Sequence, residues 1–343
     1  MKRRLASLLG AIVLVTGAVM IGCNSQSSTP TYKITLNVSK NGTVEVSPKL
    51  PQDGKVPQYT VLTFTATPNA DYETEWAGAA PDAGDKNKAM LTVTANATVT
   101  ATFKEKTVDS SLLQIESDGT LTGVTDKNAL AGSLVIPNTV TKIGDNAFEG
   151  CTKLTSVTMA DNVTEIENNA FKGCSKLTNV TIGSGVTSIK DRAFQNCTEL
   201  TSLTIGKSVT KIGYGAFSEC GKLTRITIPD SVTEIGDHAF EKCDALNAVT
   251  IGARVTKIGH RAFCECKKLT SITIPDKVTE IGSYAFDNCE VLTSAVFKDT
   301  SGWRVEPKDS GSPQNIDQAD LEDTSKAATY LKDTYCGYTW QKQ

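Results

Sequence analysis

The chain has 343 residues, and its 35 Lys+Arg against 38 Asp+Glu give a formal net charge of −3. This balance argues against nucleic-acid binding, which usually shows a basic patch or a high pI. Only two residues are His, which leaves little for His-based catalysis or a His-rich metal site. The length allows two or three domains, and 39 % apolar residues are enough for a core.

The N-terminal segment has the pattern of an export signal. Three basic residues at positions 2–4 precede an uncharged run over 5–22, which closes with Met20-Ile21-Gly22-Cys23. These last four residues resemble a bacterial lipobox, although Met20 replaces the usual Leu. The resemblance implies a lipoprotein signal peptide over 1–22 and a lipidated Cys23 that anchors the chain to a membrane. An uncleaved anchor and ordinary secretion are the alternatives. Residues 23–31 are polar and Ser-rich, as in a tether.

A small β domain is predicted over 32–105. Apolar residues alternate with period two from Tyr32 to Phe103, Asn41-Gly42 is a hairpin turn signal, and prolines separate the runs. The motifs Phe64-Thr65-Ala66-Thr67-Pro68 and Glu75-Trp76-Ala77-Gly78 resemble the divergent internalin-type B-repeat, also called the bacterial repeat domain. That resemblance implies a β-grasp-like spacer. Trp76 is either a core residue or a ligand platform.

The middle of the chain repeats every 23 residues. Phe recurs at this step from Phe148 to Phe286, Cys from Cys151 to Cys289, and Leu from Leu154 to Leu292, without an insertion. A fixed period of this length predicts a solenoid whose stacked coils bury continuous apolar ladders. Each unit reads as a strand, a second short strand Val-Thr-x-Ile, a Gly, and one helical or 3₁₀ turn containing Ala-Phe-x-x-Cys. The conformational freedom of that Gly is expected to serve a sharp corner.

The segment from Ile228 to Cys243, Ile-Pro-Asp-Ser-Val-Thr-Glu-Ile-Gly-Asp-His-Ala-Phe-Glu-Lys-Cys, closely resembles the BspA-like leucine-rich repeat. The likeness covers about residues 131–297 and implies a mainly β fold: a β-rich solenoid over 131–300, preceded by the small β-grasp-like domain. Members are bacterial surface proteins, many implicated in adhesion to host proteins and other bacteria. A linker and N-terminal cap are predicted over 106–130, and a C-terminal cap or tail over 301–343.

The cysteines and histidines do not form a recognisable reactive site. Seven Cys occupy one ladder position, which favours small buried core residues over a metal tetrahedron. Cys264 and Cys336 lie off the ladder, and we consider a disulfide between them. His238 and His260 fall in neighbouring coils, where two polar caps at turns are favoured over a surface metal pair. We therefore predict no enzyme, no metal and no cofactor.

Exposed positions of the first strand are the candidate ligand-binding residues. They are hydroxyl-rich and nearly neutral, apart from one arginine: Asn179, Thr181, Ser202, Thr204, Arg225, Thr227, Asn247, Thr250, Ser271 and Thr273. Such a face suits binding through many weak hydrogen bonds. Threonine is also a good strand former on any exposed face, so a purely structural role stays open, as does a remote likeness to ice-binding faces. A column of Lys211, Glu234, Lys257 and Glu280 is expected to stabilise the register of the second strand.

The C-terminal segment is expected to cover the last coil. Trp303 and Val305 predict a closing strand, and 321–331 a helix capped by Asp323 or Thr324. The aromatic end (Tyr335, Tyr338, Trp340) belongs either to this cap or to an exposed adhesive tail.

Together these features predict a lipid-anchored protein of the bacterial envelope or cell surface. It would bind a host matrix or bacterial surface protein, with a glycan as another possible ligand and no nucleic acid. The alternative is a structural envelope scaffold without a host ligand.

Overall fold

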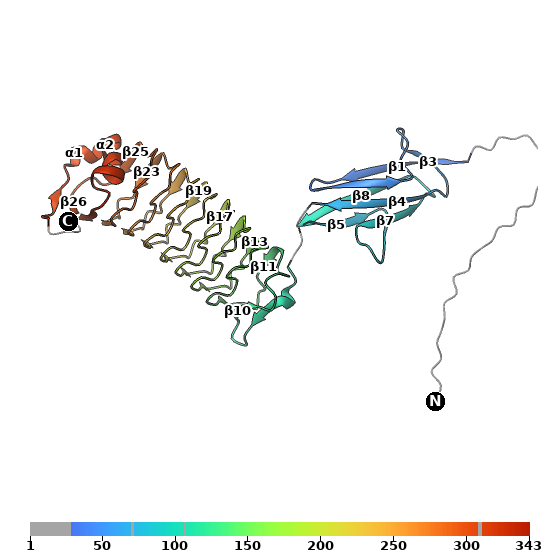
Figure 1. Cartoon of the computed structure of the whole chain (residues 1–343), viewed down its shortest axis with the longest axis horizontal. Coiled ribbons are helices and arrows are strands. Elements are labelled where there is room, and N and C mark those ends of the chain that lie inside the picture. Colours follow the sequence, from blue (N-terminus) through green and yellow to red (C-terminus); the bar gives the residue numbers. More distant parts are fainter. Residues whose placement is uncertain (1–28, 70–71, 106–107, 308–310) are drawn as a thin grey trace, which may run out of the picture. The chain divides into compact units, whose positions relative to one another are not determined.

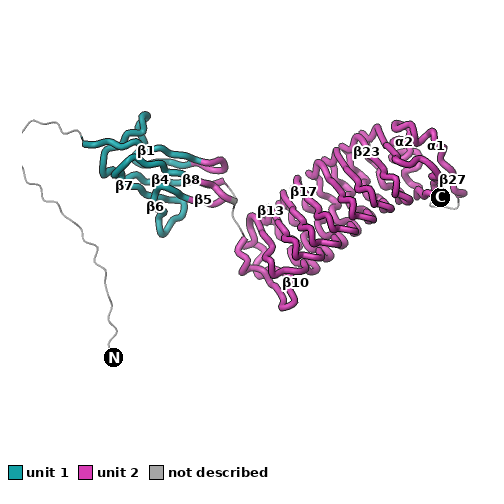
Figure 2. The backbone as a smooth tube through the Cα atoms, turned by 180° about the vertical axis from the view of Figure 1, so that it is seen from behind, with its two compact units in different colours: residues 1–38, 44–66, 76–101 teal, residues 39–43, 67–75, 102–343 magenta. Residues whose placement is uncertain are grey.

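The computed structural model describes residues 29–69, 72–105, 108–307 and 311–343. The predicted signal peptide and Cys23 lie outside the described residues. The chain divides into two compact units (Figure 2): one contains the segments up to 38, 44–66 and 76–101, and the other contains 39–43, 67–75 and 102–343.

Strands β1–β8 make a two-sheet module, called here the β domain. One sheet has the order β3-β1-β8-β5 and the other the order β2-β4-β7-β6. The strands are β1 (Thr31–Val38), β2 (Gly42–Ser47), β3 (Lys55–Pro57), β4 (Val61–Pro68), β5 (Tyr72–Ala77), β6 (Ala80–Pro81), β7 (Lys88–Thr92) and β8 (Ala97–Glu105). Alternation places Ile34, Leu62 and Phe64 in a shared core. Trp76 packs half-buried against this core and donates its indole N–H to the Lys86 carbonyl at 3.1 Å, which confirms the core interpretation.

The solenoid coils from β11 to β24 each contribute two short parallel strands, and the last coil contributes β25 alone (Figure 1). The first strands are β11 (Gly132–Val135), β13 (Leu154–Thr158), β15 (Asn179–Thr181), β17 (Ser202–Thr204), β19 (Arg225–Thr227), β21 (Ala248–Thr250), β23 (Ser271–Ile274) and β25 (Ser294–Phe297). The second strands are β12 (Lys142–Ile143), β14 (Glu165–Ile166), β16 (Ser188–Ile189), β18 (Lys211–Ile212), β20 (Glu234–Ile235), β22 (Lys257–Ile258) and β24 (Glu280–Ile281). Equivalent residues pair across neighbouring coils, as Lys211 does with Glu234.

The interior is built from the repeated Phe, Cys and Leu positions. From Phe148 to Phe286 the rings stack with centroids 4.8 to 5.5 Å apart. Each Cys thiol after the first donates to the Phe carbonyl of the preceding coil, as Cys220 does to Phe194 at 3.3 Å. Burial raises the pKa of the Cys220 thiol to about 12. These ladder cysteines are free, buried thiols that pack as small apolar residues.

The glycine after the second strand lies where the backbones of neighbouring coils approach closely. The prediction that it forms a sharp corner is wrong. None of Gly213, Gly236 and Gly259 has a positive φ; instead a Cβ on Gly236 would lie 2.7 Å from backbone of the coil before it. The left-handed corner falls two residues later, where His238 has φ 58°. In the coils that carry this glycine a Cβ would press against backbone of the coil before it, whereas Glu167 and Lys190 occupy the equivalent position in two other coils.

The Ala-Phe-x-x-Cys segment forms one hydrogen-bonded turn per coil. The amide of each Cys donates to the Phe carbonyl three residues before it, as in Cys220 to Phe217 at 3.3 Å, which is the bonding of a single 3₁₀ turn. The residue before each Cys is left-handed, as at Glu219 with φ 63°, so the turn does not continue into a helix.

Both ends of the solenoid are covered. At the N-terminal end η1 (Ser110–Leu112) leads into an antiparallel pair of β9 (Leu113–Ile115) and β10 (Thr120–Val124). At the C-terminal end β26 (Trp303–Glu306), β27 (Gln314–Asn315), α1 (Gln318–Glu322), α2 (Thr324–Thr329), a π-helical turn η2 (Tyr330–Thr334) and β28 (Thr339–Lys342) follow the last coil. Asp323 caps α2, as predicted. Trp303 and Trp340 are buried and Tyr335 and Tyr338 pack against the core, so these aromatic residues belong to the cap.

Candidate binding face of the solenoid

The first strands present two columns of polar side chains to solvent. Alternation turns Val157, Val180 and their equivalents inward and leaves the residues on either side facing out. The outer threonine column consists of Thr158, Thr181, Thr204, Thr227, Thr250 and Thr273. The neighbouring mixed column consists of Ser156, Asn179, Ser202, Arg225, Ala248 and Ser271. We call these two columns together the first-strand face; its members are exposed or half-buried.

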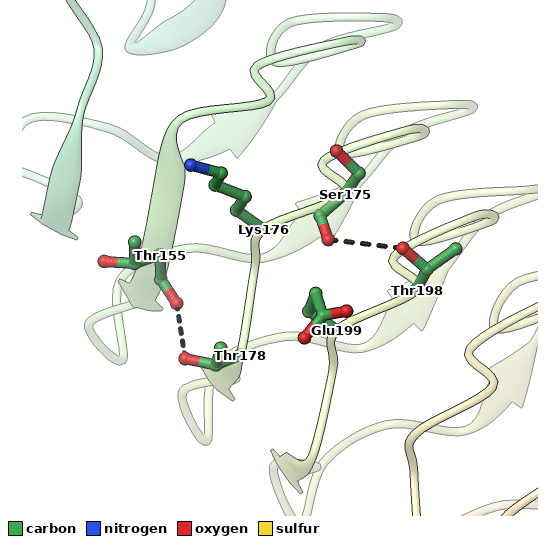
Figure 3. A pocket seen from close by; sticks show the side chains of 6 residues that line it. All are labelled: Thr155, Ser175, Lys176, Thr178, Thr198 and Glu199. Atoms are coloured by element: carbon green, nitrogen blue, oxygen red, sulfur yellow. Dashed lines mark hydrogen bonds between the residues drawn. The ribbon is translucent and has the colours of Figure 1, made fainter.

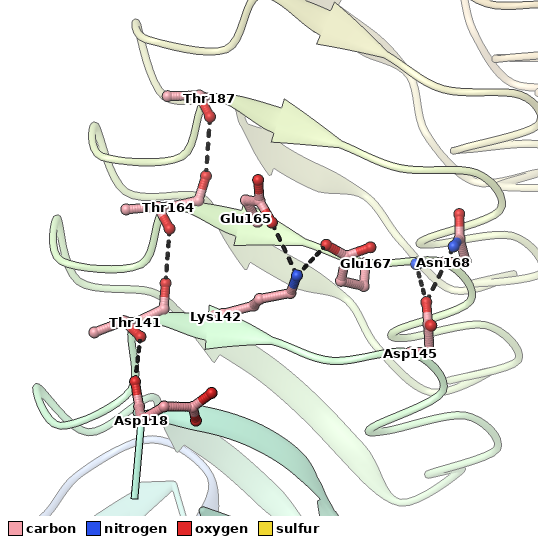
Figure 4. Close-up of polar contacts among 9 residues, drawn as sticks. All are labelled: Asp118, Thr141, Lys142, Asp145, Thr164, Glu165, Glu167, Asn168 and Thr187. Atoms are coloured by element: carbon pink, nitrogen blue, oxygen red, sulfur yellow. Dashed lines mark hydrogen bonds and ion pairs between the residues drawn. The ribbon is translucent and has the colours of Figure 1, made fainter. Parts of the chain in front are cut away.

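The second strands carry a threonine column whose hydroxyl groups are all engaged. From Thr141 to Thr279, each of the seven hydroxyls donates to the backbone carbonyl of the equivalent residue one coil earlier, at 3.0 to 3.3 Å. Figure 4 follows this chain from Asp118 to Thr187. These hydroxyls link neighbouring coils, and no donor is left for a ligand.

The outer threonine column differs. Within the described chain, no side-chain hydrogen bond is formed by Thr181, Thr204 or Thr227, or by the other hydroxyls of that column. Arg225 likewise has no ion-pair partner among the described residues. Each hydroxyl is therefore free to donate and accept, and the guanidinium offers five further donors.

The sheet formed by the first strands is broken where these groups lie. The strand order is β11-β13-β15-β17, then β19-β21, then β23-β25, whereas the sheet of second strands runs through all the coils. The amide of Ile182 donates to the Thr204 carbonyl at 2.9 Å, but the described chain has no equivalent bond from Ile205 to Thr227. Thr204, Arg225 and Thr227 therefore flank one of two breaks in the pairing of the first strands; the other lies between β21 and β23.

Nine of the ten predicted residues lie on the first-strand face. Asn247 does not, because it is equivalent to Thr178 and Thr201 in a third column. The Thr178 hydroxyl donates to the Thr155 carbonyl at 2.9 Å, Thr201 to Thr178 at 3.1 Å and Thr293 to Thr270 at 3.4 Å, so these members of the column link neighbouring coils. The sequence pattern did not separate the third column from the face because both consist of exposed, mostly small polar residues.

A shallow depression lies beside the third column. Most of the residues that line it were not predicted from the sequence. It measures about 520 Å³ and is lined by Thr155, Ser175, Lys176, Thr178, Thr198 and Glu199 (Figure 3). Glu199 pairs with Lys222 at 2.5 Å, whereas Lys176 has no ion-pair partner within the described residues. Ser175, Lys176, Thr198 and Glu199 sit in turns that follow the Cys position, where the repeat constrains residue type least.

Opposite charges join neighbouring second strands, as predicted. Lys211 pairs with Glu234 at 2.9 Å and Lys257 with Glu280 at 3.0 Å. The hydrogen bond to Glu280 raises the pKa of Lys257. Figure 4 shows a further pairing at Lys142, whose ammonium contacts Glu165 and Glu167. These groups are occupied with one another and maintain the register.

The two histidines lie on one edge of the solenoid without forming a metal pair. The His238 and His260 rings meet edge to face at 5.2 Å, and His238 Nδ1 donates to the Glu241 carboxylate at 2.9 Å. Donor atoms of Glu241, Cys264 and Glu265 lie within 4.8 Å of one another. Arg261 stands 3.6 Å from Glu241, and burial with the charges of Asp287 and Glu241 raises the pKa of Cys264 to about 12. A resident cation and a protonated thiol both oppose a metal ion at this position. Cys264 and Cys336 are free thiols.

The repeats match the BspA type leucine rich repeat region in six copies, over residues 127–247 and 233–302, which is just over half of the chain. The chain belongs to the BspA-type leucine-rich-repeat family. The divergent InlB B-repeat domain matches residues 32–107, which contain the β domain. No curated protein is similar enough to count as a match.

Two solved structures of leucine-rich-repeat proteins are similar to this BspA-type chain. A leucine rich cell surface protein from Faecalibacterium prausnitzii is 34 % identical, with a TM-score of 0.50 over 59 % of this chain and 57 % of its own. A leucine rich repeat protein from T. pallidum is 28 % identical, with a TM-score of 0.49 over 55 % of this chain and 91 % of its own. The chain thus spans little more than half of the Faecalibacterium protein.

Proposed function

We propose that this BspA-type protein is a cell-surface lipoprotein that binds a protein partner through the first-strand face of its solenoid. The contrast between threonine columns carries the proposal: hydroxyls of the second strands bond to neighbouring coils, whereas those of the outer threonine column have no partner among the described residues. Arg225, exposed among short side chains, supplies the anchor type that is enriched at interface centres.

The family supports an interaction role over catalysis. Leucine-rich-repeat solenoids are mostly non-enzymatic scaffolds that offer extended surfaces to partners. The first-strand face provides a flat array of hydroxyl, amide and guanidinium donors suited to a protein surface. A glycan would be met by the same hydroxyls, and the experiment below separates the two.

The family and the N-terminal motif support a surface location. The similar Faecalibacterium protein is a cell surface protein. No helix in the described part of the chain is long and apolar enough to cross a bilayer. We assign membrane attachment to acyl chains on Cys23, because two or three such chains hold a protein stably where one does not.

A pull-down with matched variants tests the binding proposal. The chain from Asn24 onward, immobilised, is exposed to extracts of host matrix and of co-resident bacteria. The first-face variant carries Thr204→Ala, Arg225→Ala and Thr227→Ala; the control carries Thr187→Ala, Thr210→Ala and Lys211→Ala on the second strands. We expect a protein that the unmodified chain and the control retain and the first-face variant loses. Capture of a deglycosylation-sensitive component would assign a glycan, and no specific capture would favour the envelope scaffold.

Protease shaving of intact cells tests the location, with Cys23→Ala as its partner experiment. A surface-facing solenoid is cut or labelled, and the Cys23→Ala protein leaves the detergent fraction. A solenoid protected in intact cells, or a variant that still partitions with membranes, would contradict this part of the proposal.

A further inference from the structure

One end of the β domain exposes large apolar side chains next to the start of β1. Tyr59 is 70 % exposed, Val61 51 % and Met90 48 %. Val61 and Met90 line a depression of about 590 Å³, together with Ala79, Ala80 and Leu91. Single exposed apolar residues are ordinary, but three in one small domain around a hollow form a patch.

Backbone pairing places this patch at the end where the chain enters the domain. The amide of Gln58 donates to the Pro30 carbonyl at 2.8 Å, and Thr31 pairs with Pro57. Tyr59 therefore lies beside the first residues of β1. Val61 opens β4 at the same end, where it pairs with Thr92. Met90 lies on β7 two residues before Thr92, opposite Thr63.

Two lysines face each other at the same end. Lys33 on β1 and Lys55 on β3 are directly opposed, both are exposed, and neither has an ion-pair partner within the described chain. Like charges directly opposite on neighbouring strands destabilise a sheet. The Asp53 carboxylate nearby accepts the Lys55 amide instead of pairing with an ammonium. The two ammonium groups are therefore available to an anionic partner outside the chain.

We infer that this end of the β domain docks on the bilayer, with Tyr59, Val61 and Met90 entering the headgroup region and Lys33 and Lys55 contacting anionic headgroups. The inference rests on the proposed lipid anchor. Seven residues, 24–30, separate Cys23 from Thr31, so the Cα of Thr31 can lie at most about 29 Å from that of the lipidated Cys23 in any conformation. Lys33 and Lys55 lie on the outer face of one sheet and Val61 and Met90 on the outer face of the other, so the domain would dock end-on. Aromatic, aliphatic and basic side chains are the residues that settle at a membrane interface.

The tether makes a weak intrinsic affinity sufficient. A short linker raises the effective concentration of the domain at the bilayer to about the millimolar range, so an affinity that is weak but measurable for the free protein is enough to keep the tethered domain on the bilayer. Docking would fix the β domain on the membrane and set the height at which the following chain begins.

Vesicle sedimentation with unlipidated protein tests the docking directly. The chain from Asn24 onward, with no acyl group, is mixed with vesicles of phosphatidylcholine and phosphatidylglycerol. We expect Tyr59→Ser combined with Val61→Ser and Met90→Ser to lower the partition coefficient about tenfold. The matched control is Val38→Ser, a 42 % exposed valine at the opposite end of β1, which should bind like the unmodified chain.

Two further variants separate docking from a folding defect and from charge alone. Tyr59→Trp should retain binding, because Trp is at least as favourable at the interface. Lys33→Gln combined with Lys55→Gln should lower the partition coefficient on anionic vesicles about fivefold per lysine. On pure phosphatidylcholine vesicles it should leave the partition coefficient unchanged. Absent binding by the unmodified chain, or equal binding by the triple variant, would overturn the inference. Because no acyl chain is present, these outcomes do not depend on whether Cys23 is lipidated in cells.

Discussion

The first and second strands of the solenoid both carry columns of threonine, but the hydroxyl groups of the two columns differ in their hydrogen bonding. On the second strands the Thr210 hydroxyl bonds to the coil before it, and Lys211 pairs with Glu234. On the first strands the Thr204 and Thr227 hydroxyls and the Arg225 guanidinium lack such partners among the described residues. Exposure alone therefore does not mark a binding surface; the presence or absence of an internal hydrogen-bond partner distinguishes a structural threonine from an available one.

The largest expected effect comes from the core that both faces share. Phe217 stacks between Phe194 at 5.3 Å and Phe240 at 5.4 Å. Phe217→Ala should lower the free energy of unfolding by about 3–5 kcal/mol, measured by chemical denaturation. Phe286→Ala should cost less, because terminal repeats have fewer neighbours. Equal losses at the two positions would argue against a stack stabilised coil by coil.

Removing one hydroxyl from each threonine column tests the contrast itself. Thr210→Val deletes the bond to the Thr187 carbonyl and should cost about 1 kcal/mol. Thr204→Val deletes an unpartnered hydroxyl and should change stability by less than about 0.5 kcal/mol. Urea denaturation of both variants gives the comparison, and a reversed order would mean that the two columns are misassigned.

The charge pairs of the second strands should contribute less than the hydroxyls. Lys211→Met removes the pair with Glu234, whose lysine side chain is 55 % exposed. We expect a loss of about 0.2–1 kcal/mol at low ionic strength. The loss should fade near 1 M salt, where the Debye length is about 3 Å. A loss that persists in high salt would point to packing of the lysine stem instead.

The smallest effect concerns turns that join the coils. The Ser184 amide donates to the Asp161 carboxylate at 2.7 Å, and hydrogen bonding by Ser184 lowers the pKa of that carboxyl. A carboxyl with a lowered folded-state pKa stabilises the fold above its unfolded value and loses that contribution as pH falls through the folded value. Stability should therefore decline below about pH 4, and Asp161→Asn should reduce the decline slightly in urea titrations at pH 7 and pH 3. An unchanged pH profile would show that this bond contributes nothing measurable.

The repeat itself could be predicted from the sequence because one 23-residue pattern dictates every coil. Phe, Cys and Leu at fixed offsets leave one way to bury them, and the caps at Trp303 and Asp323 follow from ordinary strand and helix signals. The role of Gly236 could not be read the same way. In a sequence, a glycine that adopts a positive φ cannot be distinguished from one that allows two backbones to approach closely. The distance from Gly236 to the neighbouring coil decides between the two roles.

The candidate face was only partly predictable for a similar reason. Period-two alternation indicates which side chains point outward, so Thr204 and Arg225 were found. Whether a hydroxyl reaches the carbonyl one coil earlier depends on the local geometry of the strand, and this separates Thr178 and Thr201 of the third column from the face. The gap between β17 and β19 has no signal in a sequence that repeats without interruption.

The affinity of matched variants for the captured partner tests the central claim most directly. Surface plasmon resonance would compare the first-face variant (Thr204→Ala, Arg225→Ala, Thr227→Ala) with the second-strand control (Thr187→Ala, Thr210→Ala, Lys211→Ala). The exposed arginine and free hydroxyls predict a Kd at least about tenfold weaker for the first-face variant and unchanged for the control. Equal affinity for both variants, with loss on substitution of Lys176 beside the third column, would move the binding site off the first-strand face.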